Sequence, residues 1–171
     1  QRNMELNPDL APRISAYNYF LAALDGTKLP GSIYSSWPLA THADGDTEVH
    51  AKHLGHAMPT RNATARSIDS VLAEAGNPKI NLVKLDVDGF ETDILRGATG
   101  LLRDMKPIFV IELAPYVLEE RNSSLADLTS LLQSSGYRFY NEENQSPMPP
   151  EPAQLQSLVA DGESINVIAR A

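Results

Sequence analysis

Three acidic residues follow an apolar run in the middle of the chain. Residues 80–87 are mostly apolar, and the run ends in Asp86, Asp88 and Glu91, with Gly89 between them. Gly89 permits a sharp turn, and an acid at position 91 suits the start of a helix because of the helix dipole. Ligands of open α/β sheets bind beyond the carboxyl ends of strands, so these acids are candidates for binding or proton transfer. The alternative is a strand-to-helix turn with one capping acid and the others in solvent.

A further acid, Glu112, stands near the end of the next apolar run, residues 108–113. One helical segment separates the two runs, and right-handed crossovers place such strands side by side or close by. We therefore expect Asp86 and Glu112 to face one crevice, with Lys84 as a charge partner. A structural pair between Lys84 and Glu112 is the alternative, because a buried acid without a partner is costly.

The histidines gather in a loop-like stretch, residues 34–64, which contains His42, His50, His53 and His56. The last three repeat every third residue, and on one helical face three imidazoles could bind a metal. Gly55 and Pro59 interrupt any such helix, and no carboxylate stands at a familiar metal-ligand spacing. We therefore expect polar loop histidines, one of which contacts substrate, and no metal site.

Strand-like and helix-like segments alternate along the rest of the chain. Ser67 and Ser124 are predicted to cap two of the helices. The alternation predicts an α/β fold with a largely parallel sheet, whose apolar strands are covered on both faces. The predicted strands cover residues 14–24, 31–39, 80–87, 108–113, 137–141 and 165–169, and the predicted helices cover residues 68–75, 94–105, 125–132 and 154–159.

Composition narrows the classes of partner. The chain has 171 residues, of which 42% are hydrophobic and 21% charged, as expected for one soluble domain. Its formal net charge of -8 disfavours nucleic acid, and no apolar run approaches the ~20 residues that a membrane span needs. Cysteine is absent, which fits the reducing cytoplasm. We expect a small-molecule or sugar-like substrate.

Three motifs together resemble the FkbM-type methyltransferases. They are Leu-Val-Lys-Leu-Asp-Val-Asp-Gly-Phe-Glu at 82–91, Ile-Leu-Arg-Gly-Ala at 94–98 and Pro-Ile-Phe-Val-Ile-Glu at 107–112. Residues 3–26, 67–72 and 165–170 extend the similarity. The resemblance implies a Rossmann-like, doubly wound, mostly parallel sheet of the class I methyltransferase type. It also implies methyl transfer from S-adenosylmethionine to a hydroxyl of a sugar or secondary metabolite.

The same resemblance implies roles for individual residues. Asp86 and Glu112 would be catalytic, with Asp86 accepting the hydroxyl proton or orienting the acceptor. Asp86, Ala23 and Leu24 would bind the cofactor, whose sulfonium cation suits an acidic crevice. Asp88, Glu91 and His56 would bind the substrate, and Asp88 and Glu112 could hold acceptor hydroxyls or a metal.

The chain departs from this family in lacking the glycine-rich turn and the ribose-binding acid of the first two strands. We therefore expect residues 1–171 to form a single, N-terminally truncated methyltransferase domain that lacks the first strands. A loop-rich insertion would occupy residues 34–64. The alternative is a non-catalytic fragment or partner subunit, with a homo-oligomer as one form.

Two other enzyme classes share part of the central motif. Leu-Asp-Val-Asp-Gly at 85–89 also resembles the first motif of haloacid-dehalogenase-type phosphatases, in which Asp86 would be the nucleophile and Asp88 the acid/base. The spacing of these two aspartates also resembles the metal-binding Asp-x-Asp of sugar-nucleotide glycosyltransferases. The surrounding residues fit neither class well.

Overall fold

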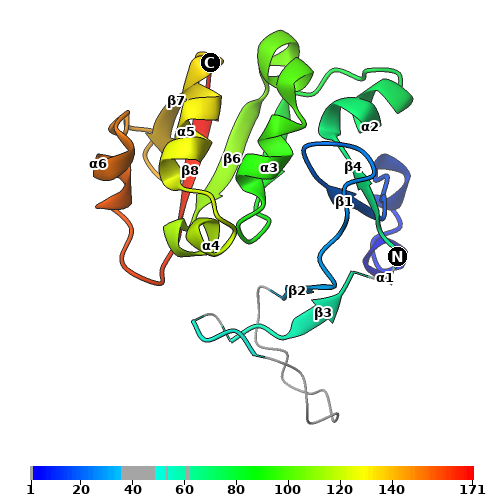
Figure 1. The fold of residues 1–171 in the computed structure, drawn as a ribbon. Coiled ribbons are helices and arrows are strands. Elements are labelled where there is room, and N and C mark those ends of the chain that lie inside the picture. Colours follow the sequence, from blue (N-terminus) through cyan, green and yellow to red (C-terminus); the bar gives the residue numbers. More distant parts are fainter. Residues whose placement is uncertain (1, 36–48, 53, 61) are drawn as a thin grey trace.

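A four-stranded sheet forms the centre of the computed structural model, which describes residues 2–35, 49–52, 54–60 and 62–171. Its order is β5-β6-β8-β7, with β5 at Leu82–Leu85, β6 at Ile108–Leu113, β8 at Ile165–Arg170 and β7 at Arg138–Asn141 (Figure 1). Strands β5 and β6 are parallel, whereas β8 is antiparallel to both β6 and β7. Three strands therefore run in one direction and β8 opposes them.

Two small sheets accompany the central one in the described part of the chain. Strand β1 (Tyr19–Leu21) pairs in parallel with β4 (Thr64–Arg66), and β2 (Ser32–Tyr34) pairs antiparallel with β3 (Ala57–Pro59). The predicted α/β class is confirmed. The single doubly wound sheet is not, because the described strands fall into separate and mixed sheets.

The helices are short, and two of them begin at the predicted caps. The backbone N–H of Ser70 donates to Ser67 Oγ at 3.2 Å, and that of Asp127 donates to Ser124 Oγ at 3.1 Å. None of the described helices is long and apolar enough to cross a membrane. The helices are α1 (Arg2–Glu5), the 3-10 helix η1 (Ala11–Arg13), α2 (Ile68–Glu74), α3 (Glu91–Arg96), the π-helix η2 (Leu101–Met105), α4 (Pro115–Glu120), α5 (Leu125–Ser134) and α6 (Pro152–Gln156).

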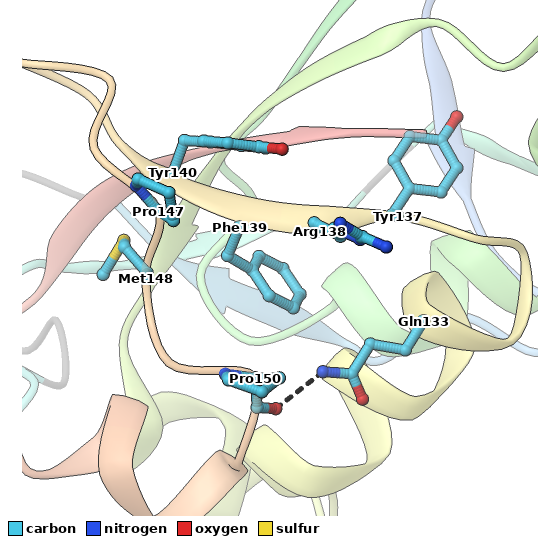
Figure 2. A pocket seen from close by; sticks show the side chains of 8 residues that line it. All are labelled: Gln133, Tyr137, Arg138, Phe139, Tyr140, Pro147, Met148 and Pro150. Carbon is cyan, nitrogen blue, oxygen red and sulfur yellow. Dashed lines mark hydrogen bonds between the residues drawn. The ribbon is translucent and has the colours of Figure 1, made fainter.

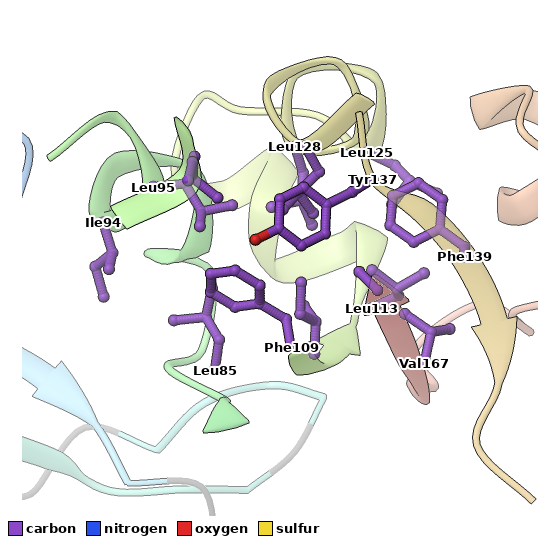
Figure 3. Packing of buried hydrophobic residues seen from close by; sticks show 14 of the residues in the cluster. Leu85, Ile94, Leu95, Phe109, Leu113, Leu125, Leu128, Tyr137, Phe139 and Val167 are labelled. Carbon is purple, nitrogen blue, oxygen red and sulfur yellow. The ribbon is translucent and has the colours of Figure 1, made fainter. Parts of the chain in front are cut away.

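The hydrophobic core lies between one face of the central sheet and the helices α3 and α5, which contact each other (Figure 1). Figure 3 shows the rings of Phe109 and Tyr137 at its centre, packed edge to face with centroids 5.5 Å apart. Tyr137 is buried but keeps its hydroxyl satisfied, because that hydroxyl donates to the Pro107 carbonyl at 3.0 Å. Leu128 and Leu132 of α5 are buried in this core.

The opposite face of the sheet is more exposed, so the prediction of strands covered on both faces is wrong. Burial alternates along β6, where Phe109, Ile111 and Leu113 are buried and the residues between them are not. Leu82 on β5 is 61% exposed. Because side chains of a strand alternate between faces, Lys84, Val110 and Glu112 share the open face.

The predicted helix over residues 94–105 is also wrong, because it is two elements. A Cβ atom at Gly97 would lie 2.4 Å from the Ala22 carbonyl oxygen, so α3 ends where another segment crosses it closely. The Asp69 carboxylate then accepts hydrogen bonds from the backbone N–H groups of Gly100 (2.7 Å) and Leu101 (3.1 Å). This distant side chain caps the start of η2, and sequence spacing cannot reveal it.

Candidate functional site

The site lies at the carboxyl ends of β5 and β6, where the parallel pairing of the two strands brings their acidic residues together. Lys84 is in register with Val110, and Leu85 with Ile111, so Asp86 and Glu112 follow at the same end of neighbouring strands. The predicted meeting of these two acids is confirmed, because the strand register places them at the same end and the charge of Asp86 contributes to the raised pKa of Glu112. Two carboxyl groups so placed can share and exchange a proton.

Lys84 is the cation of this site, but the predicted Lys84–Glu112 pair is wrong. The Lys84 Nζ lies 3.3 Å from Asp86 Oδ2 and donates to Asn166 Oδ1 at 2.7 Å. Asn166 is the register partner of Glu112 on β8, so this hydrogen bond spans the open face of three strands. Lys84 thereby holds Asp86 in place and leaves Glu112 to a different partner.

That partner is Ser164, whose Oγ donates to Glu112 Oε1 at 2.6 Å. Burial raises the pKa of Glu112, and the nearby charges of Asp86 and Asp88 raise it further, while the Ser164 hydrogen bond opposes the rise. A carboxyl group whose pKa lies above its ordinary value retains its proton to higher pH than an ordinary glutamate does. Glu112 is therefore suited to carry a proton at this strand end.

Glu91 is placed inside the turn that follows β5. Its side chain is only 2% exposed, and Oε1 accepts hydrogen bonds from the backbone N–H groups of Val87 (3.2 Å) and Gly89 (3.4 Å). Burial raises the pKa of Glu91. Gly89 has a φ of +96°, and a Cβ there would lie 2.5 Å from the Val117 carbonyl oxygen of α4. Glu91 and Gly89 thus shape the acidic turn and fit it against α4.

Tyr116 on α4 forms the next wall of the site, and sequence reasoning missed it. Burial raises the pKa of the Tyr116 hydroxyl, and the charges of Glu112 and Asp88 raise it further, so the ring lies beside the acidic strand ends. Helix α4 follows β6 directly after Ala114. No spacing pattern marked this short helix, because Pro115 begins it and only two turns follow.

The histidine segment reaches the same helix through His50 rather than His56. His50 is buried, and its Nε2 lies 2.8 Å from Glu120 Oε2, while its Nδ1 accepts the backbone N–H of Lys52 at 3.2 Å. The backbone N–H of His56 donates to Ser35 Oγ at 2.9 Å, next to the antiparallel pairing of β2 and β3. His50 is a polar loop histidine, as predicted, but it is buried, and the contact of His56 with substrate stays a prediction. His42 and His53 lie outside the described residues.

The residues assigned to the cofactor form two groups, Ala23 with Leu24 on one side and Asp86 on the other. The Ala23 N–H donates to Asp93 Oδ2, in the first turn of α3, at 3.4 Å, and Leu24 is 71% exposed. Asp86 instead contacts Lys84 and Glu112. No described contact joins these two groups, and their roles in cofactor binding stay predictions. Asp88, with a φ of +50°, lies in the turn next to Asp86, and its charge acts on Glu112 and Tyr116.

Among the described residues, no three His, Asp or Glu side chains are arranged to hold a metal ion. A separate cavity lies away from the acidic strand ends. A cavity of about 460 Å³ opens along β7, between Phe139 and the 147–150 segment, and Gln133 Nε2 donates across it to the Pro150 carbonyl at 2.6 Å (Figure 2). Strand β8 separates β7 from β6, so this cavity is remote from the acidic strand ends.

Comparison with known proteins supplies the family. No curated protein and no solved structure matches the chain. The family model of the methyltransferase FkbM domain matches residues 3–139, which include β5, β6 and all the acids described above. The chain therefore belongs to the methyltransferase FkbM family.

Proposed function

We propose that this protein transfers a methyl group from S-adenosylmethionine to a hydroxyl group of a sugar or secondary metabolite. The observation that carries the proposal is the carboxyl pair of Asp86 and Glu112 at the ends of neighbouring parallel strands. Methylation of a hydroxyl requires a base for its proton, and a carboxylate within hydrogen-bonding reach can serve as that base. Membership of the family supports methyl transfer over the phosphatase and glycosyltransferase readings of the same motif.

Each side chain of the pair has a distinct task in this proposal. Asp86, held by Lys84 at 3.3 Å, orients the acceptor hydroxyl and accepts its proton. Glu112, whose pKa lies above the ordinary value, shares that proton and passes it toward solvent. Asp88 and the buried Glu91 fix the geometry of the turn, which aligns the acceptor for an in-line displacement.

The residues present fit the charge of the methyl donor. S-adenosylmethionine supplies an electrophilic methyl group on a sulfonium cation. The strand ends that hold Asp86, Asp88 and Glu112 are acidic. The nearby cation, Lys84, is engaged by Asp86 and Asn166. Asp86 is the residue of this chain that we assign to the sulfonium side. Ala23 and Leu24 are assigned to the remainder of the cofactor by resemblance alone.

Calorimetric titration of the chain with S-adenosylhomocysteine tests the proposal, followed by methyl transfer to a panel of hydroxylated compounds. We expect Asp86→Asn to lower methyl transfer about 100-fold or more, because a positioned general base contributes on that scale. Asp9→Asn removes a matched exposed carboxylate far along the chain and should leave transfer unchanged.

A folded chain that binds no cofactor would contradict the proposal and favour a non-catalytic partner subunit. Methyl transfer that survives in Asp86→Asn would refute the role of the carboxyl pair while leaving the enzyme class intact. Dependence of folding on protein concentration would favour the homo-oligomer.

A further inference from the structure

We propose that a pocket beside α4 binds a positively charged amine, and that the methyl acceptor is a hydroxylated compound that carries one. The pocket has a volume of about 190 Å³ and lies between α4 and residues 156–163. Tyr116 and Glu119 line one wall, and Gln156, Asp161 and Glu163 line the other. The inference deepens the proposed function, since it names the acceptor class for the same site.

An ammonium group already lies at the rim of this pocket, and it belongs to the chain itself. Lys52 Nζ lies 4.9 Å from the centroid of the Tyr116 ring and 3.0 Å from Asp161 Oδ1. An aromatic face with a carboxylate beside it is the arrangement that recognises amines, because the ring quadrupole and the negative charge both attract the cation. The position of Lys52 therefore indicates that this surface favours an ammonium group.

Two more carboxylates remain in the pocket after Lys52 has engaged Asp161. Glu119 and Glu163 line the opposing walls, and no ion pair joins either of them to another residue in the described part of the chain. The Gln156 side chain adds an amide that can bond to hydroxyl groups. A ligand with one ammonium and several hydroxyls would match the aromatic ring, the carboxylates and the amide together.

Two residues bring the pocket close to the acidic strand ends. Glu163 lines the pocket, and the next residue, Ser164, donates to Glu112 at 2.6 Å. Tyr116 lines the pocket from the other side, and the charges of Glu112, Asp88 and Glu163 all act on it. An amine held between Glu119 and Glu163 would therefore present the rest of its molecule toward Asp86 and Glu112.

A pair of sugars that differ in one group provides the test. Each of two sugars, methyl 2-amino-2-deoxyglucopyranoside and methyl glucopyranoside, is titrated to about 50 mM into the isotopically labelled chain, without cofactor. The backbone amide signals of the chain are followed by NMR. At about pH 6.5 an amine with a pKa near 7.7 is mostly protonated. We expect the backbone amide signals of Ala160 and Gly162 to shift, with the amino sugar binding roughly fivefold more tightly.

Variants show whether the pocket causes this preference. Glu119→Gln combined with Glu163→Gln should abolish it, and Lys52→Ala should tighten binding of the amino sugar by freeing Asp161. Glu5→Gln, which removes an exposed carboxylate on α1, should change nothing. These carboxylates are exposed, so the variants should fold, and their amide spectra confirm it.

Equal binding of the two sugars would overturn the inference, as would signal shifts confined to residues outside the pocket. A preference that persists in the double variant would also overturn it. Because the titration uses neither cofactor nor methyl transfer, its failure is distinguishable from a failure of the proposed function, which the titration with S-adenosylhomocysteine reports.

Discussion

Glu91→Gln is expected to stabilise the protein, although it alters a buried side chain next to the candidate site. The Glu91 side chain is 2% exposed, and its Oε2 has no hydrogen-bond partner among the described residues. Glutamine keeps the Oε1 acceptor for the N–H groups of Val87 and Gly89 and removes the buried charge. The sign of the effect depends on which of these terms is larger.

The structure allows both terms to be weighed. The two hydrogen bonds are long, 3.2 and 3.4 Å, so replacing a charged acceptor by a neutral one should cost about 1 kcal/mol in total. Burial of an unpaired charge costs several kcal/mol, and an unpaired amide costs about 1–3 kcal/mol. The balance is a gain of about 1 kcal/mol, or a melting temperature about 2–4 °C higher.

The gain should depend on pH in a defined direction. Burial raises the pKa of Glu91 in the folded state above its unfolded value, so the folded protein binds the proton more tightly. The charge penalty is therefore complete above the folded pKa, shrinks as the pH falls between the folded and the unfolded pKa, and is absent below the unfolded pKa. The advantage of Glu91→Gln should be largest at neutral pH and should shrink on acidification.

Urea denaturation followed by circular dichroism, at about pH 7.5 and about pH 5.5, measures both effects. Glu143→Gln removes an exposed carboxylate in the turn after β7 and should leave stability unchanged. If Glu91→Gln destabilises the protein at both pH values, then the charged hydrogen bonds outweigh the burial of the charge and the reasoning is wrong.

Three further predictions concern the supports of the site. Ser164→Ala removes the hydrogen bond that lowers the pKa of Glu112, so the pKa of Glu112 should rise. The acidic limb of the pH profile of methyl transfer should then move to higher pH. An unmoved limb would count against Glu112 as the proton carrier. Asp69→Ala leaves the N–H groups of Gly100 and Leu101 without their acceptor, so the free energy of unfolding should fall by about 2 kcal/mol. Urea denaturation measures this loss, and a loss below about 0.5 kcal/mol would contradict the role of Asp69 as a cap. Gly97→Ala forces a methyl group against the Ala22 carbonyl and should lower the melting temperature by several degrees, whereas Gly31→Ala, where the space is open, should have a much smaller effect.

Much of the fold is predictable because local patterns fix local structure. The apolar runs give β5 and β6, and Ser67 and Ser124 mark the starts of α2 and α5. The predicted strand over residues 108–113 agrees in both ends with β6. The meeting of Asp86 and Glu112 follows from these elements, because the handedness of the crossover leaves few other arrangements.

The partners of the site residues are not predictable in this way, since they come from segments far apart in the sequence. Lys84 engages Asn166, Glu112 engages Ser164, and His50 engages Glu120, and each pair is separated by 50 residues or more. Several donors and acceptors along the chain could have served equally well. Only packing of the elements against one another selects among them.

The sequence by itself determined the family motif, the two acidic strand ends and the serine caps of α2 and α5. Tertiary structure decided that Glu91 faces inward as a support of the turn, that Lys84 holds Asp86 and not Glu112, and that a pocket beside Tyr116 adjoins the acids. The physical reason is that spacing along a chain sets which face a side chain occupies, whereas burial, charge pairing and pKa depend on everything that packs against that face.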